Sequence, residues 1–413
     1  MTAEERDPKN KQRNSRRYEE SKAAVVAAAI SCINQKGVSR MTLADVAQKL
    51  GVATPALTYY FKKKDDLAVA CLMQGLRRMD EFIDESEKFS DSKIRIETLF
   101  NAFMSFKRRA NSGETEEFPN FSDTRGLDAE TLNQAYLHMF GRLRGLLKGS
   151  GYETLKGKEI SAIAHILMGE INWTPIWYVN IYPEDSHRYC ERFMDILSNG
   201  LAVPQADWSP KELPPLLPRI DAADGASMEL FLRAASAQIN ELGYRGTSID
   251  KIAARINLTK GAFYHHIDTK DELVAACFKR TFDALHGTII AAETSSASGL
   301  QTLSTFVSTL VNHQIRGEAP LLRTSAISTA LDLTKVTILN EITKVTTRIA
   351  SIICDGIADG SIRKIDANVG AQMVMAIINN ADELPQYLPG ISPTLALELY
   401  VHPIFRGIFQ RAV

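Results

Sequence analysis

The chain has 413 residues, of which 45% are hydrophobic and 23% charged, and its formal net charge is −1. This length predicts more than one hydrophobic core, and the composition is ordinary for a soluble globular protein. No apolar run reaches the roughly 20 residues that a membrane-spanning helix needs, and the charged N-terminus lacks the apolar core of a signal peptide. We therefore expect a cytoplasmic protein with no membrane partner. The five cysteines lie far apart and form no C-x-x-C pair, which argues against a zinc site or a disulfide framework.

Positive charge is concentrated near the N-terminus. Residues 1–73 carry 13 Lys/Arg and 8 Asp/Glu, a balance of +5, whereas residues 219–280 carry 9 and 8, a balance of +1. A basic segment is what phosphate binding requires, so the first of these regions is the stronger candidate for contact with nucleic acid. Residues 1–18 are polar and basic. We expect them to form either a solvated, disordered tail or a basic arm that follows the DNA backbone or enters a minor groove.

Residues 41–67 predict three short helical pieces after an alanine-rich helix. One apolar face of the first piece is marked, at the spacing i, i+3, i+4 and i+7, by Leu43, Val46, Ala47 and Leu50. Gly51 ends this piece, and Thr54 followed by Pro55 predicts the N-cap and first residue of the second. Aspartates at 65–66 predict the first turn of a longer helix, because the helix dipole favours negative charge there. Two short helices joined by a tight turn are typical of a helix-turn-helix.

The same pattern returns 206 residues later, in residues 247–273. The four apolar positions are repeated by Ile249, Ile252, Ala253 and Ile256. Thr259 is expected to cap the second piece of this copy, the role expected of Thr54 in the first copy, and Thr269 with Glu272 predicts a capping box for the third. Six residues are identical in the gapless comparison of the two copies: Gly37, Ala47, Ala56, Lys64, Asp65 and Leu67. A repeat of this length predicts that the whole chain is a tandem duplication.

The rest of the chain shows helical periodicity and no sustained strand alternation, so we predict an all-α fold. In the first half we expect helices over residues 19–35, 94–109, 128–148, 158–182 and 185–201. Five prolines within residues 203–218 predict a stiff, extended linker, which is the clearest domain boundary. In the second half we expect helices over residues 226–242, 300–316, 321–359, 367–387 and 394–410.

The two repeated segments resemble the TetR/AcrR family of bacterial transcriptional regulators. The resemblance is carried by residues 262–267 with Lys270, Asp271 and Leu273, and by the corresponding residues of the first copy. It covers about 55 residues of each half, and residues 173–178 (WTPIWY) look like a late helix of the family's C-terminal domain. The resemblance implies two tandem TetR-like repeats, each an N-terminal three-helix DNA-binding domain followed by a C-terminal helical ligand-binding and dimerisation domain. The expected segments are a basic arm (1–18), a first DNA-binding domain (19–70), a first regulatory domain (71–202), the linker (203–218), a second DNA-binding domain (219–276) and a second regulatory or dimerisation domain (277–413).

A recognition helix points polar and aromatic side chains into the major groove while its other face packs on the preceding helix. In the first copy this reading face consists of Thr54, Pro55, Thr58 and Tyr59, with Leu57 and Phe61 facing inward. In the second copy it consists of Thr259, Lys260, Gly261, Tyr264 and His265, with Phe263 and Ile267 facing inward. The family resemblance assigns phosphate contacts to the residues that match Thr42, Tyr60, Lys64, Ser248, His266 and Lys270. The first copy departs from the family pattern: Thr58 replaces the usual Tyr, Pro55 the commoner Gly, and Tyr60 the usual His.

The expected partner is a double-stranded DNA operator. Members of the family bind DNA as two-fold dimers, so the two halves are expected to pair inside one chain as a pseudo-dimer that reads an imperfect palindrome; the competing arrangement is a homodimer of chains. Four aromatic residues of the first half suggest a pocket for a small apolar or aromatic inducer: Phe103, Phe140, Trp173 and Trp177. An aromatic stripe at helical spacing is also what an ordinary core contains. No cofactor or metal site is expected.

Enzymatic function is not supported by any motif. Glu184 and His187 form one E-x-x-H, but a di-iron bundle needs two such pairs and two further carboxylates. Adjacent histidines at 265–266 point about 100° apart on a helix and cannot chelate a metal from one face. The sequence therefore predicts a DNA-binding transcriptional regulator, acting as a ligand-responsive repressor. The alternative is a helical ligand-binding or scaffold protein whose second helix-turn-helix mediates protein contacts.

Overall fold

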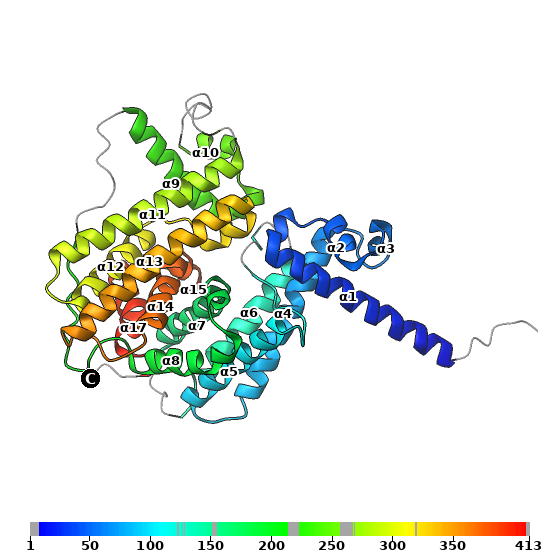
Figure 1. Ribbon diagram of the computed structural model, residues 1–413, viewed down its shortest axis with the longest axis horizontal. Coiled ribbons are helices and arrows are strands. Elements are labelled where there is room, and N and C mark those ends of the chain that lie inside the picture. The colour runs from blue at the N-terminus through cyan, green and yellow to red at the C-terminus, as the bar shows by residue number, and fades with distance from the viewer. Residues whose placement is uncertain are drawn as a thin grey trace, which may run out of the picture.

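The computed structural model describes residues 8–121, 124–125, 127, 129–150, 155–213, 223–256, 267, 269–318 and 320–409. Over these residues the chain is built from helices joined by turns, with two isolated β-bridges and no strand (Figure 1). No helix within the described residues is both long and apolar enough to cross a membrane. The predicted all-α fold is confirmed.

The first half contains eight α-helices among its described residues: α1 (Pro8–Arg40), α2 (Leu43–Leu50), α3 (Thr54–Thr58), α4 (Lys64–Ser86), α5 (Ser92–Asn111), α6 (Glu130–Leu146), α7 (Gly157–Trp177) and α8 (Ser186–Asn199). The described part of residues 1–18 is the beginning of α1, so from residue 8 onward the predicted arm is a helix and the alternative of a disordered tail is wrong there. The predicted helix over 158–182 ends early, at Trp177: Pro175 removes a backbone donor from its last turn, and a 3₁₀ turn (Tyr178–Asn180) follows.

The described elements of the second half are α9 (Ala223–Gly246), α10 (Ile249–Arg255), α11 (Lys270–Ser295), α12 (Gly299–Ile315), α13 (Asp332–Ala358), α14 (Ala367–Asn380), α15 (Leu384–Tyr387), α16 (Pro393–Ala396), a π-turn (Leu397–Val401) and α17 (His402–Arg406). The predicted helix over 321–359 is wrong in its first turns, where η4 (Thr324–Thr329) is a 3₁₀ segment. The backbone N–H groups of Arg323 and Thr324 bond to the side chains of Asn240 and Asn379 instead of entering an α-helical ladder.

The tandem repeat is visible in matching local contacts. In each copy the first helix is interrupted by a left-handed glycine, Gly37 (φ 74°) in α1 and Gly243 (φ 69°) in α9. The thiol of Cys71 lies 3.6 Å from the carbonyl oxygen of Val26, and at the positions 206 residues later Cys277 lies 3.7 Å from that of Leu232. Both copies therefore use the same packing of the first helix on the long helix, α1 on α4 and α9 on α11.

The two halves are joined by a helical seam that buries one continuous apolar core. Helices α7 and α8 pack against α14 and the C-terminal segment of residues 397–406 (Figure 1). The indole nitrogen of Trp173 donates to Gln372 at 2.9 Å, and His165 Nε2 lies 2.9 Å from the carbonyl oxygen of Asn380. These are buried polar contacts between the halves, and they hold α7 in register with α14.

Close approach of the backbone marks the centre of this seam. Gly200 (φ 73°) follows α8, and a Cβ there would lie 2.3 Å from the carbonyl oxygen of Phe405. Gly407 (φ 92°) follows α17, and a Cβ there would lie 2.3 Å from the carbonyl oxygen of Ser198. Each glycine thus makes room for the other half at nearly equivalent positions, as an isologous two-fold contact does.

The described part of the linker is held against the second half. Arg406 donates to the carbonyl oxygens of Pro204 and Ala206, and Trp208 packs on Phe405 with ring centroids 4.7 Å apart. Residues 203–213 form a turn at 204–205 and no helix, and they are held against the second half rather than separated from it: Ser209 accepts from Gln301 of α12, and Lys211 N donates to Thr305 of α12. The remaining residues of the predicted linker, 214–218, lie outside the described part of the chain.

Candidate nucleic-acid interface

Helix α2 is terminated at both ends by local signals. Thr42 is the N-cap: its hydroxyl accepts from the backbone N–H of Asp45, whose carboxylate accepts in return from the backbone N–H of Thr42, so the two residues form a capping box. Gly51 ends the helix in the left-handed region (φ 67°), where a Cβ-bearing residue is strained. This turn aims the following residues away from the body and into α3.

Helix α3 separates a buried face from an exposed face, as predicted. Leu57 and Phe61 are buried against α2 and α1. The predicted reading residues are all exposed: Thr54, Pro55, Thr58 and Tyr59. Tyr59 is 73% exposed, a fraction that Tyr182 also reaches and that no other described Phe, Tyr or Trp exceeds. The geometry therefore leaves a polar and aromatic face available to an external partner.

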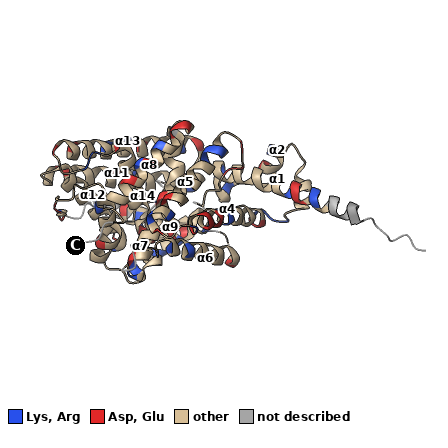
Figure 2. Cartoon of the chain, turned by 90° about the horizontal axis from the view of Figure 1, so that it is seen from below, with Lys and Arg blue, Asp and Glu red and all other residues tan. Residues whose placement is uncertain are grey.

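Three tyrosines form a cluster that links α3 to α1. The ring centroid of Tyr18 lies 5.6 Å from that of Tyr59 and 5.1 Å from that of Tyr60. Tyr18 thus supports the reading face from behind, and the exposed basic residues of α1 continue from the same helix. Figure 2 shows both blue and red residues on the part of α1 that extends beyond α2. The predicted phosphate contact Tyr60 lies in this cluster, half-buried.

Thr54 is not the N-cap that its sequence context predicts. The structure assigns that position to Ala53, with no side-chain capping bond, and Thr54 is already helical. The first backbone bond of α3 runs from the N–H of Ala56 to the carbonyl oxygen of Ala53, so this five-residue helix begins one residue earlier than the sequence predicts. The Thr54 side chain is consequently exposed for contact with a partner.

The family resemblance assigns a phosphate contact to Lys64, and in this structure, which contains no DNA, Lys64 bonds to backbone carbonyl groups. Its ammonium group donates to the carbonyl oxygens of Val38, Ser39 and Met41 at 3.1, 2.8 and 3.2 Å. These bonds hold the turn after Gly37 against the start of α4, which is a structural role. The phosphate contact of Lys64 stays a prediction, and Lys62 and Lys63, which lie between α3 and Lys64, are exposed.

We call the two helix-turn-helix segments, residues 19–70 and 219–276, the first and second heads. The structure describes the second head in part. Ser248 caps α10 by accepting from the backbone N–H of Lys251, and Thr269 with Glu272 forms the predicted capping box of α11. Ile267 is buried, as predicted. The Lys270 ammonium lies 4.1 Å from the ring centroid of Tyr244, a cation–π contact that holds it at the base of the head. The remaining predicted reading and phosphate residues of this copy, Thr259, Lys260, Gly261, Tyr264, His265 and His266, lie outside the described residues.

The two heads touch each other through two crossed ion pairs, which we call the head clasp. Arg245 of the second head lies 2.9 Å from Asp65 of the first, and Arg40 of the first lies 3.7 Å from Asp271 of the second. Asp65 and Asp271 are equivalent residues of the two copies, and the arginines occupy adjacent positions of the equivalent turn. Arg40 also donates to the carbonyl oxygen of Thr329 at 3.0 Å. Reciprocal contacts of this kind are expected of two units related by an approximate two-fold axis.

The four aromatic residues suggested as an inducer pocket are part of the core. Phe103 packs edge-on against Phe118, and Phe140 lies 4.6 Å from the ring of Tyr387 in the second half. Trp177 stacks on Tyr189 with ring centroids 4.3 Å apart. Together with Trp173, which bonds across the seam, all are less than 10% exposed. They therefore fill the core of the first half and the seam.

Comparison with known proteins matches the model of bacterial regulatory proteins of the tetR family twice, over residues 25–71 and 231–277. The Tn10 TetC protein of Escherichia coli is 38% identical over 55 residues, which are 13% of this chain and 28% of that protein. The negative transcriptional regulator IcaR of the icaADBC biofilm operon in Staphylococcus aureus is 32% identical over 68 residues, 16% of this chain and 37% of that protein. These matches thus span about a third of the relatives' length.

Among solved structures, the TetR family transcriptional regulator PfmR from Thermus thermophilus matches with a TM-score of 0.36 and 20% identity, over 44% of this chain and 99% of that chain. The two family matches cover both helix-turn-helix segments, and each lies at the start of one repeat of the fold. Each of the two repeats therefore begins with a segment that matches the tetR family of bacterial regulatory proteins.

Proposed function

We propose that this protein is a sequence-specific transcriptional regulator in which the two heads of one chain act as a pair on one DNA duplex, and that it acts as a ligand-responsive repressor. The observation that carries the proposal is the exposed reading face of α3 on a head that is joined to a second head by the seam and the clasp. IcaR is named a negative regulator, which supports repression as the direction of control.

Pairing within one chain is supported by the reciprocity of the contacts. The crossed glycines of the seam and the crossed ion pairs of the clasp both relate the two halves by an approximate two-fold operation. The apolar surfaces that would otherwise bind another chain are buried between α7, α8, α14 and residues 397–406. A covalent pair needs no second chain to present two heads.

Because the two copies differ in sequence, a covalent pair reads unlike half-sites. Thr58 and Tyr59 of the first head correspond to Tyr264 and His265 of the second, so the bases that each head prefers differ. We therefore expect the operator to be an imperfect palindrome, with a spacing set by the seam and the clasp.

DNA binding itself is tested by selecting bound duplexes from a random pool and measuring the affinity of the best one against salt. If the two heads together neutralise about six phosphates, the slope of log K against log[salt] is about −5. A selected duplex that carries only one half-site should bind more weakly and with a clearly smaller slope. Failure to enrich any duplex, or an affinity that is independent of salt, contradicts the proposal.

If the clasp holds the two heads together, the charges of Asp65 and Arg245, which lie on different heads, should interact. Asp65→Arg faces Arg245 with a like charge, and we expect about a three- to tenfold loss of affinity for the selected two-site duplex, since exposed pairs contribute up to about 1 kcal/mol. The exchanged variant Asp65→Arg/Arg245→Asp restores opposite charges and should recover most of the loss. The matched control reverses the exposed pair Lys279–Asp283 on α11, away from the clasp, and should change nothing. Losses that simply add in the double variant would show that the two residues do not interact.

A further inference from the structure

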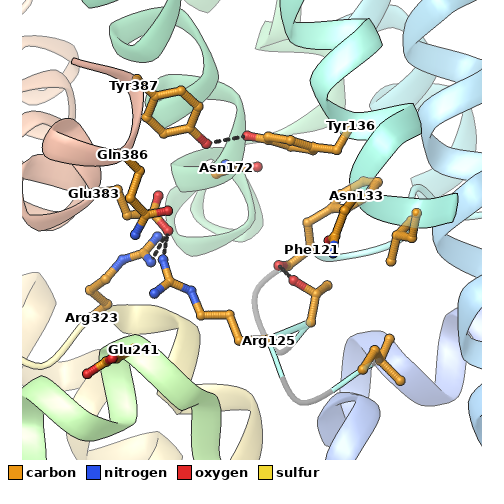
Figure 3. A pocket seen from close by; sticks show the side chains of 13 residues that line it. Phe121, Arg125, Asn133, Tyr136, Asn172, Glu241, Arg323, Glu383, Gln386 and Tyr387 are labelled. Atoms are coloured by element: carbon orange, nitrogen blue, oxygen red, sulfur yellow. Dashed lines mark hydrogen bonds and ion pairs between the residues drawn. The ribbon is translucent and has the colours of Figure 1, made fainter. Parts of the chain in front are cut away.

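A cavity of about 410 Å³ lies at the seam, between the two regulatory domains and the second head. Its described walls come, in the first half, from Asn172 of α7 and residues 121, 124–125, 127, 132–133 and 136, and, in the second half, from Arg323 and residues 383 and 386–387. Glu241 of α9, the first helix of the second head, completes the rim. Figure 3 shows these side chains converging from both halves on one space. A molecule bound here would touch three parts of the chain at once.

The lining of this cavity is polar. Tyr136 and Tyr387 meet across the seam with their hydroxyl oxygens 3.0 Å apart, and amide side chains are supplied by Asn133, Asn172 and Gln386. Among the described lining residues, three carry large aliphatic or phenyl side chains: Phe121, Leu127 and Leu132. An apolar occupant would leave the tyrosine hydroxyls and amides without partners, which is unfavourable. The cavity thus differs from the apolar or aromatic site that the sequence suggests.

The charged groups of the cavity are unevenly paired. Arg125 and Arg323 both donate to the same oxygen, Oε1 of Glu383 (Figure 3). Arg323 is buried and has a second carboxylate within reach, because its Nε lies 3.5 Å from Asp382. Arg125 is only partly buried and has Glu383 as its one carboxylate partner in the described structure. Among the described residues, Arg125 also donates to a neutral acceptor, the carbonyl oxygen of Asn240.

This pairing decides which charge on a ligand the cavity can accept. An incoming carboxylate can bind Arg125 while Glu383 and Asp382 remain with Arg323, so no buried charge loses its partner. An incoming cation would have to take Glu383 from both arginines, leaving a buried guanidinium with weaker pairing, which costs several times more than a surface ion pair contributes. The exchange is therefore favourable for an anion and unfavourable for a cation.

We propose that this cavity is the effector site of the protein, and that its ligand is a small polar molecule carrying a carboxylate, which binds Arg125 in competition with Glu383 and hydrogen-bonds to the tyrosine pair and the amides. The regulatory part of this inference rests on the proposed function. Arg125 also bonds to α9 through Asn240, whose side chain in turn accepts from Arg323 N and donates to Leu321 O. A ligand that breaks the hydrogen bond between Arg125 and Asn240 therefore removes one contact that holds α9 of the second head in place.

The test is a binding measurement on the full chain without DNA. Thermal unfolding is followed with 10 mM succinate, glutarate, L-glutamate or 4-hydroxybenzoate, each against its amide counterpart at equal ionic strength. A ligand that binds only the folded chain raises Tm. We expect at least one carboxylate to raise Tm where its amide does not. Arg125→Gln should weaken that binding at least about tenfold, whereas Glu383→Gln, which removes the competing carboxylate, should strengthen it.

The matched control is Arg192→Gln, which removes another arginine that pairs across the seam, with Asp366, outside this cavity. It should leave the ligand-induced shift unchanged. A shift from none of the carboxylates, an equal shift from the amides, or a shift that survives Arg125→Gln would overturn the site. Since no DNA is present, loss of this site and failure of DNA binding are distinguishable. A carboxylate that binds should then also change the affinity for the selected duplex in the unaltered chain and leave it unchanged in Arg125→Gln.

Discussion

Thr58→Asp is expected to abolish specific DNA binding by the first head, with a loss of affinity for the selected duplex of about 100-fold or more. Thr58 lies on the exposed face of α3, and its hydroxyl bonds only to the carbonyl oxygen of Pro55 one turn earlier. A carboxylate there faces the phosphates at the groove edges, and opposed like charges cost several kcal/mol at an interface. The fold should be unaffected because the side chain is exposed. Affinity is measured by titration of the labelled duplex at fixed salt.

The matched control for this substitution is Thr347→Asp. Thr347 is also exposed, on α13, and its hydroxyl makes the same kind of bond, to the carbonyl oxygen of Thr343. The substitution adds the same charge far from the proposed reading face and should change affinity less than about twofold, as surface changes away from a site usually do. Equal losses in the two variants would mean that net charge alone, and no contact at α3, governs binding.

Glu170→Met is expected to stabilise the protein by about 1–3 kcal/mol at neutral pH, the cost of leaving a buried polar group without a partner. Glu170 lies in α7 at the seam, is 3% exposed, and its Oε1 has no hydrogen-bond partner. Burial raises the pKa of Glu170 well above its ordinary value of 4.5. The folded chain therefore holds a proton that the unfolded chain releases above pH 4.5, and the free energy of unfolding falls as pH rises through that value.

The gain from Glu170→Met should accordingly be small at pH 4 and grow with pH. The measurement is urea unfolding of both chains between pH 4 and pH 8. The control is Glu191→Met on α8, an exposed carboxylate, which should change stability by less than about 0.5 kcal/mol at every pH. A destabilised Glu170→Met variant, or a gain without pH dependence, would show that this carboxyl group is paired and charged in the folded protein.

The parts of the fold that depend on interactions between residues close in sequence could be predicted. The repeat of apolar positions in α2 and α10, the glycine interruptions at 37 and 243 and the capping box at Thr269 depend on residues within a few positions of one another. The capping box of α2 was not predicted, because aspartate stands at Asp45 where the usual pattern has Glu or Gln. The exposed and buried faces of α3 followed from its spacing alone.

Contacts between distant segments could not be predicted in this way. Lys64 meets the carbonyl groups of residues 38–41 only because the turn after Gly37 folds back on α4. The cavity joins Arg125 to Glu383, residues 258 positions apart, and no periodicity relates them. The clasp could have been suspected from one signal: Asp65 and Asp271 are identical in the two copies, although an acidic first turn would be satisfied by either Asp or Glu.

The central claim is that one chain presents both heads to one duplex, and the most direct test is the mass of the complex with the selected two-site duplex, measured by sedimentation or light scattering at concentrations near the dissociation constant. We expect one chain of 45.8 kDa per duplex, and we expect Thr58→Asp in that single chain to abolish tight binding. Two chains per duplex, with the isolated chain inactive until it dimerises, would contradict the covalent pair.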